Sequence, residues 1–432
     1  MLDLKIGQKI ELSDGSYVNV VKKLGEGSQG AVYSVKSNSG EAYALKWYIS
    51  QDIINNQDFY RNLENNIRLG SPAPSFIWPL KLAIRQLGSY GYIMDLCPST
   101  YIEFSKFFKN SFFKDAKFSS RQAQIHAALC IVDGFRHLHI RGFFFSNISA
   151  DIFLVNPKTG NVRIFADDNV TANNIEGFIS GTVKYMAAEV VNGSRPNINS
   201  DFFSLAIILY RIFMIDHPME GKRTLQPCLT DEIQKKVYGN DMVFCWDVDL
   251  DVNRPDKINH KNSIYNWSHS PLSLRQIFSK ALSRRAVLYP EQRVRDIEWK
   301  NYLLKLRANS ICCPSGLHDI LADESIDKCP RCNHIIDMHK IPRIEFRDFS
   351  YAITDKKLFY LNDSLIPYGL GVVYKGKNGP EIGLKNLSGV TWSLETASGN
   401  ILQIKEGECF PLRNGMQIVF NGVTRCRIVL GN

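Results

Sequence analysis

The segment HLHIRGFFFSNISADIFLV, residues 137–155, constrains the fold of this chain more than any other stretch. A Leu-His pair precedes a glycine and three phenylalanines, and an apolar run, Phe153-Leu154-Val155, begins eight positions after Phe145. Apolar residues recur upstream at helical spacing, which predicts a buried helix from Ser119 onward: Ile125, Ala128, Leu129, Val132 and Phe135. Residues 145–152 are therefore expected to form a loop between a buried helix and a short buried strand.

A glycine-rich segment near the amino terminus has the chemistry of a phosphate-binding loop. It fits the pattern G-x-G-x-x-G-x-V, in which missing side chains let backbone N–H groups approach phosphates closely. The matching residues are Gly25, Gly27, Gly30 and Val32. Lys46 follows one strand later, and its charge on a long side chain can reach α- and β-phosphates. A glycine hairpin without a ligand and a solvated lysine are the alternatives, but the two features together favour a nucleotide cleft.

The two segments together resemble a protein kinase. In the kinase order HLH-x-x-G-h-h-H-R-D-h-x-x-x-N, the His, Arg and Asp become Phe145, Ser146 and Asn147, and the metal-binding Asn becomes Ile152. Residues 162–168, VRIFADD, stand in the place of V-K-I-x-D-F-G, so Ala166 replaces the carboxylate that would hold Mg²⁺. No catalytic residue is therefore expected at these three degenerate positions, Asn147, Ile152 and Ala166.

Other kinase-like residues belong to the scaffold. Residues 181–189, GTVKYMAAE, resemble the G-T-x-x-Y-M-A-P-E end of an activation segment, with Ala188 in place of Pro. Asp201 stands where a kinase Asp holds the catalytic-loop backbone, and Arg293 stands where a kinase Arg pairs with Glu189. We expect both scaffold contacts to form.

The resemblance also implies which residues would surround a nucleotide. Glu64, in a helix-like stretch from Asp58 to Leu69, would pair with Lys46. Residues 91–97 read as a buried strand that enters the hinge, with Met94 as gatekeeper and a backbone that reads the adenine edge. The full set of expected nucleotide contacts is Gly25, Gly27, Gly30, Val32, Ala44, Lys46, Glu64, Met94, Asp95 and Cys97.

Several linked segments resemble the bacterial serine/threonine-kinase-like proteins of the TerY-phosphorylation triad, over about the first 340 residues. They are ALKWY (44–48), FIWPL (76–80), GYIMDL (91–96), DNV (168–170), HPMEG (217–221) and EW (298–299). Active-looking members carry Y-R-D-I-S-x-N-N and C-D-N-D-N-V, where this chain has FSNISADI and FADDNV. The resemblance implies a von Willebrand factor A-type protein and a type 2C phosphatase as partners, and a link to tellurite and other stress responses.

The replaced residues predict a pseudokinase. Asn147 keeps the shape of Asp but cannot accept the hydroxyl proton, and Ile152 and Ala166 remove both usual magnesium ligands. We therefore expect a scaffold or regulator with weak or metal-independent ATP binding and without Mg²⁺. The alternative is a residually active or atypical serine/threonine phosphotransferase, in which a shifted loop brings other carboxylates onto a metal. Those carboxylates are Asp151, Asp167 and Asp168.

Cysteine spacing predicts a zinc ribbon. Cys329-Pro330-Arg331-Cys332 is a CPxC knuckle, whose spacing puts two thiolates on one tetrahedral metal. The other half is degraded, because Gly316 stands where relatives carry the second cysteine of a CxxC pair. We expect structural zinc on Cys313, His318, Cys329 and Cys332, with Cys312 as an alternative. The competing interpretation is a hairpin that has lost zinc and is held by packing.

The last ninety or so residues predict a small antiparallel β-sandwich, because alternating apolar runs are separated by Gly or Asn turns. The runs are 358–361, 371–374, 390–394, 401–404, 417–420 and 427–430. Residues 382–388, Trp392 and PLRNG (411–415) resemble a divergent forkhead-associated domain, a class that binds phosphothreonine. Lys385, Asn386 and Ser388 are candidate contacts, and a sandwich without phosphate selectivity is an equal alternative.

Composition is typical of a soluble cytoplasmic protein with several domains. The 432 residues exceed one usual core, no apolar run approaches the length that spans a bilayer, and MLDLKIGQKI does not resemble a secretory signal. The net charge of +9 is dispersed, so neither a membrane nor nucleic acid is expected as a partner. The predicted architecture is α+β and bilobal: kinase N-lobe at 1–97, C-lobe at 98–307, zinc ribbon at 308–341 and forkhead-associated-like all-β sandwich at 342–432.

Overall fold

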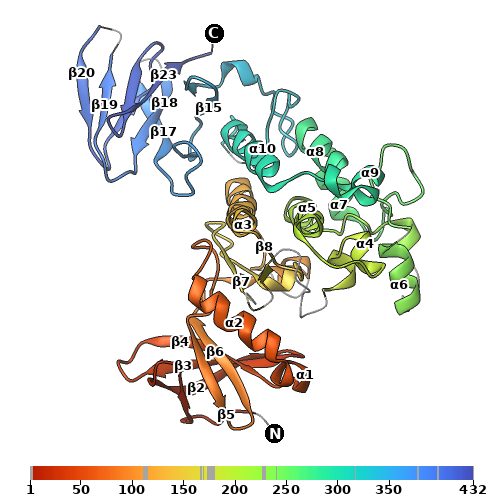
Figure 1. Ribbon diagram of the computed structural model, residues 1–432. Coiled ribbons are helices and arrows are strands. Elements are labelled where there is room, and N and C mark those ends of the chain that lie inside the picture. Colours follow the sequence, from red (N-terminus) through yellow and green to blue (C-terminus); the bar gives the residue numbers. More distant parts are fainter. Residues whose placement is uncertain are drawn as a thin grey trace.

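The computed structural model describes residues 3–109, 115–165, 168, 170–172, 181–225, 230–239, 241–316, 318–376, 379–396 and 398–431. Figure 1 shows a sheet-containing lobe at the amino-terminal end, a larger helical lobe, and β-sheets at the carboxyl-terminal end. A short cysteine-containing segment joins the helical lobe to these last sheets.

The amino-terminal lobe is a six-stranded antiparallel sheet in the order β1-β2-β3-β4-β6-β5. Its strands are β1 (Lys9–Glu11), β2 (Tyr17–Glu26), β3 (Gly30–Ser37), β4 (Ala42–Tyr48), β5 (Lys81–Gln86) and β6 (Ser89–Asp95). Between β4 and β5 the chain forms α1 (Gln51–Asn55) and α2 (Gln57–Leu69), and α2 lies on the side of the sheet toward the helical lobe (Figure 1). Strand β6 approaches β4 so closely that a Cβ on Gly91 would lie 2.0 Å from the Lys46 carbonyl oxygen, which requires glycine there.

The helical lobe is built around α3 (Arg121–Ile140) and α5 (Ile198–Met214), which contribute most of its buried residues. Ser120 begins α3 by accepting a hydrogen bond from the Ala123 N–H at 3.0 Å, and Gly142 follows its end with φ +79°. The remaining helices are α4 (Ala188–Val191), α6 (Asp231–Tyr238), α7 (Lys261–Ser268), α8 (Leu272–Leu282), α9 (Arg284–Leu288) and α10 (Asp296–Asn309). Short strands flank the loops: β7 (Ile102–Glu103), β8 (Phe143–Phe144), β9 (Phe153–Val155), β10 (Val162–Ile164) and β11 (Thr171–Ala172).

The cysteine-containing segment has one short antiparallel pair, β12 (Ile311–Cys312) with β13 (Asp319–Ile320). Two further antiparallel sheets follow, in the orders β15-β14-β23-β22-β19-β20 and β16-β17-β18-β21. Their strands are β14 (Arg343–Glu345), β15 (Ser350–Ala352), β16 (Leu358–Phe359), β17 (Gly369–Gly376), β18 (Gly379–Asn386), β19 (Trp392–Glu395), β20 (Ile401–Ile404), β21 (Cys409–Pro411), β22 (Gln417–Phe420) and β23 (Thr424–Val429). The two sheets share an apolar core centred on Trp392, Phe359 and Phe420. All six apolar runs expected as strands overlap strands of this region.

The carboxyl-terminal sheets are attached to α10. Arg307 donates to the carbonyl oxygens of Ser364 at 2.9 Å and Asn362 at 3.1 Å, and its guanidinium lies 4.2 Å from the Tyr360 ring centre. Lys357 is buried and donates to the Ala308 carbonyl at 2.7 Å, one of the last carbonyls of α10. Burial lowers the pKa of Lys357 well below its ordinary value, so the donated hydrogen bond is what satisfies this carbonyl at the end of the helix. The last sheets are therefore joined to the helical lobe by buried contacts as well as by the chain.

None of the described helices combines the length and the apolar character needed to cross a bilayer.

Candidate functional site

The glycines of the expected phosphate-binding loop have two different roles. A Cβ on Gly25 or Gly27 would meet nothing within 4 Å, whereas one on Gly30 would lie 2.5 Å from the Trp47 carbonyl oxygen. Gly27 N–H donates to Gly30 O at 2.9 Å and closes the turn between β2 and β3. Gly30 is thus required by packing against β4, while Gly25 and Gly27 leave the loop backbone accessible to a ligand.

Lys46 lies on β4 opposite Val32, but its partner differs from the expected one. Its ammonium lies 2.5 Å from Asp168 Oδ2, and Glu64 is exposed on α2. The expected pair between Lys46 and Glu64 is not formed. The kinase motif assigns the metal-binding carboxylate to position 166, which is Ala in this chain. In the structure the carboxylate beside Lys46 comes instead from Asp168, two residues later.

Asp168 is fully buried and has a second partner. Tyr48 donates its hydroxyl to Asp168 Oδ2 at 2.7 Å, and burial, with the charge of Asp168, raises the pKa of Tyr48 well above its ordinary value. Asp168 Oδ1 is buried and has no hydrogen-bond partner among the residues that the structure describes. A carboxylate oxygen in that state has an unused capacity for a hydrogen-bond donor or a cation.

Helix α2 contacts the segment that follows Asp168 through amides. Asn62 and Asn66 both donate side-chain hydrogen bonds to the Val170 carbonyl, at 2.8 Å and 3.0 Å. These two bonds take over the role of joining α2 to the cleft that was expected of Glu64.

The expected hinge residues lie at the end of β6. Met94 is buried opposite Ala44 of β4, and Asp95 pairs with Tyr43 in the same ladder. Cys97 is half-buried just beyond, and burial raises the pKa of its thiol to about 11. The structure therefore packs Ala44 and Met94 into one apolar cluster with residues of α1 and α2.

The catalytic-loop backbone is held as the sequence predicted. Asp201 Oδ2 accepts the Phe145 N–H at 2.7 Å and contacts His139 Nε2 at 3.2 Å, and His139 Nδ1 contacts Asp296 Oδ2 at 3.0 Å. Burial opposes the charged form of His139, but these hydrogen bonds outweigh it, so the pKa of His139 lies above its ordinary value. The expected pair of Arg293 with Glu189 is also present, with two contacts of 2.7 Å.

Ser146 has a strained backbone between these supports. Its φ is +59°, and Asn147 N–H donates to Phe145 O at 2.8 Å, which is a γ-turn of the less favourable hand. Strained residues of this kind persist where the surrounding contacts determine them strongly, and they cluster at functional sites. The contacts of Asp201 with Phe145 and His139 therefore support this backbone conformation.

The side chains on this loop differ from those of the kinase motif H-R-D-h-x-x-x-N. Phe145 and Ile152 are buried in the core of the helical lobe, and Phe145 packs edge-on against Phe135. Asn147 Oδ1 accepts the Thr182 N–H at 3.3 Å. Asp151 is exposed, and Ala166 and Asp167 lie outside the described residues.

The cysteine segment brings together three of the four expected ligands. The sulfurs of Cys313, Cys329 and Cys332 lie within 4.8 Å of one another, which suits a soft metal such as Zn²⁺. The Arg331 and Cys332 N–H groups donate to the Cys329 sulfur. The His334 N–H, with the Ser315 hydroxyl, lowers the pKa of the Cys332 thiol to about 7.

His318 is not the fourth member of this group, and neither is Cys312. The turn closed by Gly316 N–H to Cys313 O, at 2.7 Å, folds Ser315 back so that its hydroxyl lies 3.1 Å from Cys313 Sγ. His318 and Cys312 instead line a neighbouring cavity beside Thr354. The Ser315 hydroxyl therefore lies beside the thiols and donates to the Cys313 sulfur, a feature that the sequence spacing did not reveal.

The candidate phosphothreonine contacts in the last sheets are mostly structural. Asn386 is buried and donates to the carbonyls of Val390 and Ile404, while its Oδ1 accepts from Ser388. The Ser388 hydroxyl in turn accepts from Trp392 Nε1 at 2.9 Å. Both side chains are saturated inside the domain, and of the three only Lys385 is partly exposed.

Comparison with known proteins agrees with the geometry of the first two lobes. The protein kinase domain family matches residues 18–287. A putative ribosomal protein S6 kinase alpha-1 of Caenorhabditis elegans is 26% identical over 227 residues, which cover 50% of this chain and 27% of that protein. The human ribosomal protein S6 kinase alpha-2 is 24% identical over 225 residues, 50% of this chain and 30% of its own length.

The match to a plant relative covers a larger share of that relative's length. The serine/threonine-protein kinase AtPK2/AtPK19 of Arabidopsis thaliana is 26% identical over 213 residues, 47% of this chain and 42% of the relative. This chain thus spans less than half the length of each of these three relatives. The six-stranded lobe and the contacts of Asp201 and Arg293 are consistent with the family match. The chain belongs to the protein kinase family through residues 18–287.

Proposed function

We propose that this chain is a pseudokinase that regulates or scaffolds a bacterial phosphorylation-signalling complex. The observation that carries the proposal is the carboxamide of Asn147 at the position of the catalytic base, on a loop whose backbone support is retained. A carboxamide cannot take up the acceptor hydroxyl's proton, and Ile152 is an apolar core residue where a kinase has a metal ligand. A loop that keeps its backbone contacts but lacks the catalytic base and a metal ligand supports a protein that binds its partners without transferring phosphate.

Nucleotide binding in this proposal is weak. Protein kinases in general use ATP with Mg²⁺, and the open backbone at Gly25 and Gly27 supports contact with phosphates. Lys46, however, already has Asp168 as a counter-ion at 2.5 Å, so phosphate must compete with that carboxylate.

A second candidate function, residual or atypical phosphotransfer, is supported by one observation. The buried Oδ1 of Asp168 has no partner among the described residues, and it lies on the same carboxylate that contacts Lys46. A divalent cation at this oxygen would take Asp168 away from Lys46 and free the ammonium for phosphate. In this candidate, metal and nucleotide bind cooperatively.

One experiment separates the two candidates. ATP is titrated calorimetrically into the purified chain with Mg²⁺ and with a chelator, and the same samples receive γ-labelled ATP and a generic protein acceptor. The pseudokinase predicts equal ATP affinity in both buffers and no label above that of Lys46→Ala. Tighter binding with Mg²⁺, together with label that Asp168→Asn abolishes and the exposed control Asp348→Asn retains, would establish the enzyme instead.

The partners we propose are those of the triad that the sequence resembles, a von Willebrand factor A-type protein and a type 2C phosphatase, in the cytoplasm and in stress responses such as tellurite resistance. If the chain is a scaffold, pull-down of either partner survives Lys46→Ala, since the cleft is not the contact. Loss of the complex in that variant would contradict a scaffold role independent of nucleotide.

For the remaining regions we propose a structural zinc ribbon and a forkhead-associated-like sandwich. The three clustered thiols, with backbone N–H groups directed at the knuckle sulfurs, support zinc. The six- and four-stranded sheets support the sandwich, although Asn386 and Ser388 are engaged internally. A phosphothreonine peptide library tests the reader function, with its unphosphorylated counterpart as control; equal binding of the two would reject it.

A further inference from the structure

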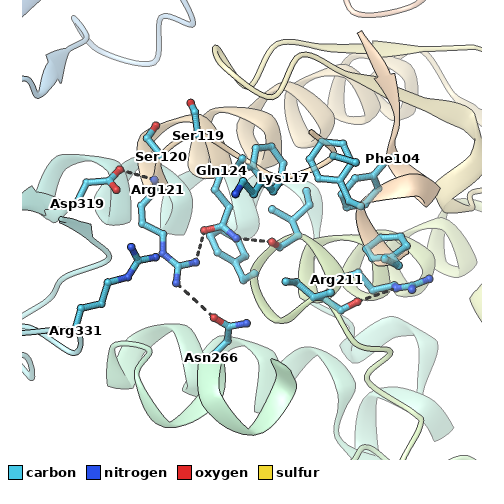
Figure 2. A pocket seen from close by; sticks show the side chains of 17 residues that line it. Phe104, Lys117, Ser119, Ser120, Arg121, Gln124, Arg211, Asn266, Asp319 and Arg331 are labelled. Atoms are coloured by element: carbon cyan, nitrogen blue, oxygen red, sulfur yellow. Dashed lines mark hydrogen bonds between the residues drawn. The ribbon is translucent and has the colours of Figure 1, made fainter. Parts of the chain in front are cut away.

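A cavity of about 300 Å³ lies between the start of α3, the end of α5 and the CPxC knuckle. Figure 2 shows its lining side chains. None of the lining residues belongs to the nucleotide cleft or to the three clustered thiols. The cavity is therefore separate from the sites described above.

One part of the cavity wall is aromatic. Phe104 and Phe108 lie edge-on with their ring centres 4.8 Å apart, and the rings of Phe107 and Phe118 are 5.0 Å apart. Phe213, at the end of α5, also lines the cavity. Rings fixed against one another in this way offer a rigid apolar surface to a planar or apolar group.

The opposite part carries positive charge. Arg121 on α3 and Arg331 of the knuckle extend toward each other (Figure 2), and Lys117 and Arg211 also line the cavity. Arg211 lies against the aromatic wall, with its guanidinium 3.5 Å from the Phe108 ring centre. Arg121 donates to two neutral oxygens, Gln124 Oε1 at 2.7 Å and Asn266 Oδ1 at 3.4 Å. Burial, together with the charge of Arg331, lowers the pKa of Arg121.

Arg121, Arg331 and Lys117 lack an ion-pair partner within the described ranges of the chain. The carboxylate that lines the cavity is Asp319, and its Oδ2 accepts the backbone N–H groups of Arg121 and Gln122, the latter at 3.2 Å. Asp319 thus caps the start of α3, and a single carboxylate faces Arg121, Arg331 and Lys117. Two guanidiniums that face each other with a single carboxylate nearby have the donors and the charge that suit an anion.

We propose that this cavity binds a small phosphate monoester with an aromatic or apolar body. The phosphate lies between Arg121 and Arg331, where the planar guanidiniums provide paired N–H donors, and the body rests on the phenylalanines. The volume admits a small molecule and is at the lower limit for ligand pockets, which favours a metabolite over a macromolecular segment. Because Arg331 lies between Cys329 and Cys332, the knuckle positions one half of the anion site.

Phenyl phosphate is the probe, titrated calorimetrically into the full chain carrying Lys46→Ala, so that phosphate binding in the nucleotide cleft is removed. We expect phenyl phosphate to bind the Lys46→Ala chain, with an affinity that falls as ionic strength rises. Its affinity should exceed that of inorganic phosphate, because the phenyl ring adds contacts with the phenylalanines. Arg331→Ala weakens it at least tenfold, since a charge-assisted hydrogen-bond pair is lost. Arg331→Lys recovers part of the affinity, and Arg347→Ala, an exposed arginine outside the cavity, leaves it unchanged.

Each other outcome overturns the proposal. Absence of binding at millimolar phenyl phosphate, or equal binding by Arg331→Ala and Arg347→Ala, would show that the cavity holds no anion. Loss of binding on Lys46→Ala alone would place the ligand in the cleft. A phosphothreonine peptide that bound tighter than phenyl phosphate through Arg331 would replace the small ligand by a protein one. Arg331 is exposed, so its variants are expected to fold, and unchanged thermal unfolding and metal content verify this.

Discussion

Lys46 and Asp168, 122 residues apart in the chain, form a 2.5 Å ion pair in which the carboxylate is fully buried. Tyr48 donates to the same carboxylate oxygen, so Asp168 accepts from two side chains of β4, Lys46 and Tyr48. The charge that a kinase would present to ATP is thereby neutralised within the chain. A ligand for this cleft must displace Asp168 or bring a cation that engages it.

Asp168→Asn should lower the free energy of unfolding by about 3 kcal/mol, because it leaves the largely buried Lys46 ammonium without a counter-ion. Urea denaturation measures the loss. Asp348→Asn, on an exposed side chain, should stay within about 0.5 kcal/mol of the original chain. Equal stability of the two variants would mean that the pair contributes nothing to folding.

His139 should give the chain a pH-dependent stability. Its pKa in the folded state is above the ordinary value of about 6.5, so its contribution is complete below that pH and is lost as pH rises through the raised pKa. The difference in unfolding free energy between the original chain and His139→Gln should therefore be largest below about pH 6.5 and shrink as pH rises through the raised pKa of His139. A difference that stays constant across this change of pH would contradict the prediction.

Gly316→Cys should strengthen zinc binding. A Cβ at this position meets nothing within 4 Å, so a fourth thiol is accommodated, although φ of +72° costs about 1 kcal/mol for a residue other than glycine. Substitution with Co²⁺ follows the ligand set, since each added thiolate increases the sulfur-to-metal absorption. We expect a stronger band for Gly316→Cys and a weaker one for Cys332→Ser.

The control for the zinc prediction is His318→Ala, which should leave the Co²⁺ spectrum unchanged because His318 lies outside the thiol group. A changed spectrum in that variant would restore His318 as a ligand and reject the arrangement with Ser315 beside the thiols.

Arg307→Ala should loosen the attachment of the carboxyl-terminal sheets. The guanidinium satisfies two loop carbonyls and lies over Tyr360 in a buried setting, so its removal should cost about 2 to 3 kcal/mol of stability. Limited proteolysis should then cut near the loop that contains Asn362 and Ser364. Lys305→Ala, an exposed change on the same helix, should leave the cleavage pattern as it was.

Local patterns predicted the supports of the catalytic loop because those residues are chemically distinctive and regularly spaced. Asp201, Arg293 and Glu189 form the contacts that the alignment implied. The β-strands of the last region were predicted from alternation alone, since side chains on successive strand residues point to opposite faces. The absence of a carboxylate at position 147 could also be read directly.

Which side chain pairs with Lys46, and which lies beside the thiols, could not be predicted from local sequence patterns. The alignment offered Glu64 as the partner of Lys46 and Asp168 as an alternative metal ligand. The pairing of Asp168 with Lys46 depends on where the chain after β10 returns. The same holds for Ser315 and His318, because a tight turn placed a hydroxyl beside the sulfurs where spacing had suggested an imidazole.

The sequence by itself determined which chemical groups stand on the catalytic loop, where the glycine loop and knuckle lie, and which stretches become strands, since these follow from residue identity and local periodicity. Only the tertiary structure decided which carboxylate meets Lys46, which oxygen meets the thiols, how α10 holds the last sheets, and that Arg121 and Arg331 share a cavity. Those relationships join residues far apart in the chain, so they depend on distances that are set when the elements pack together.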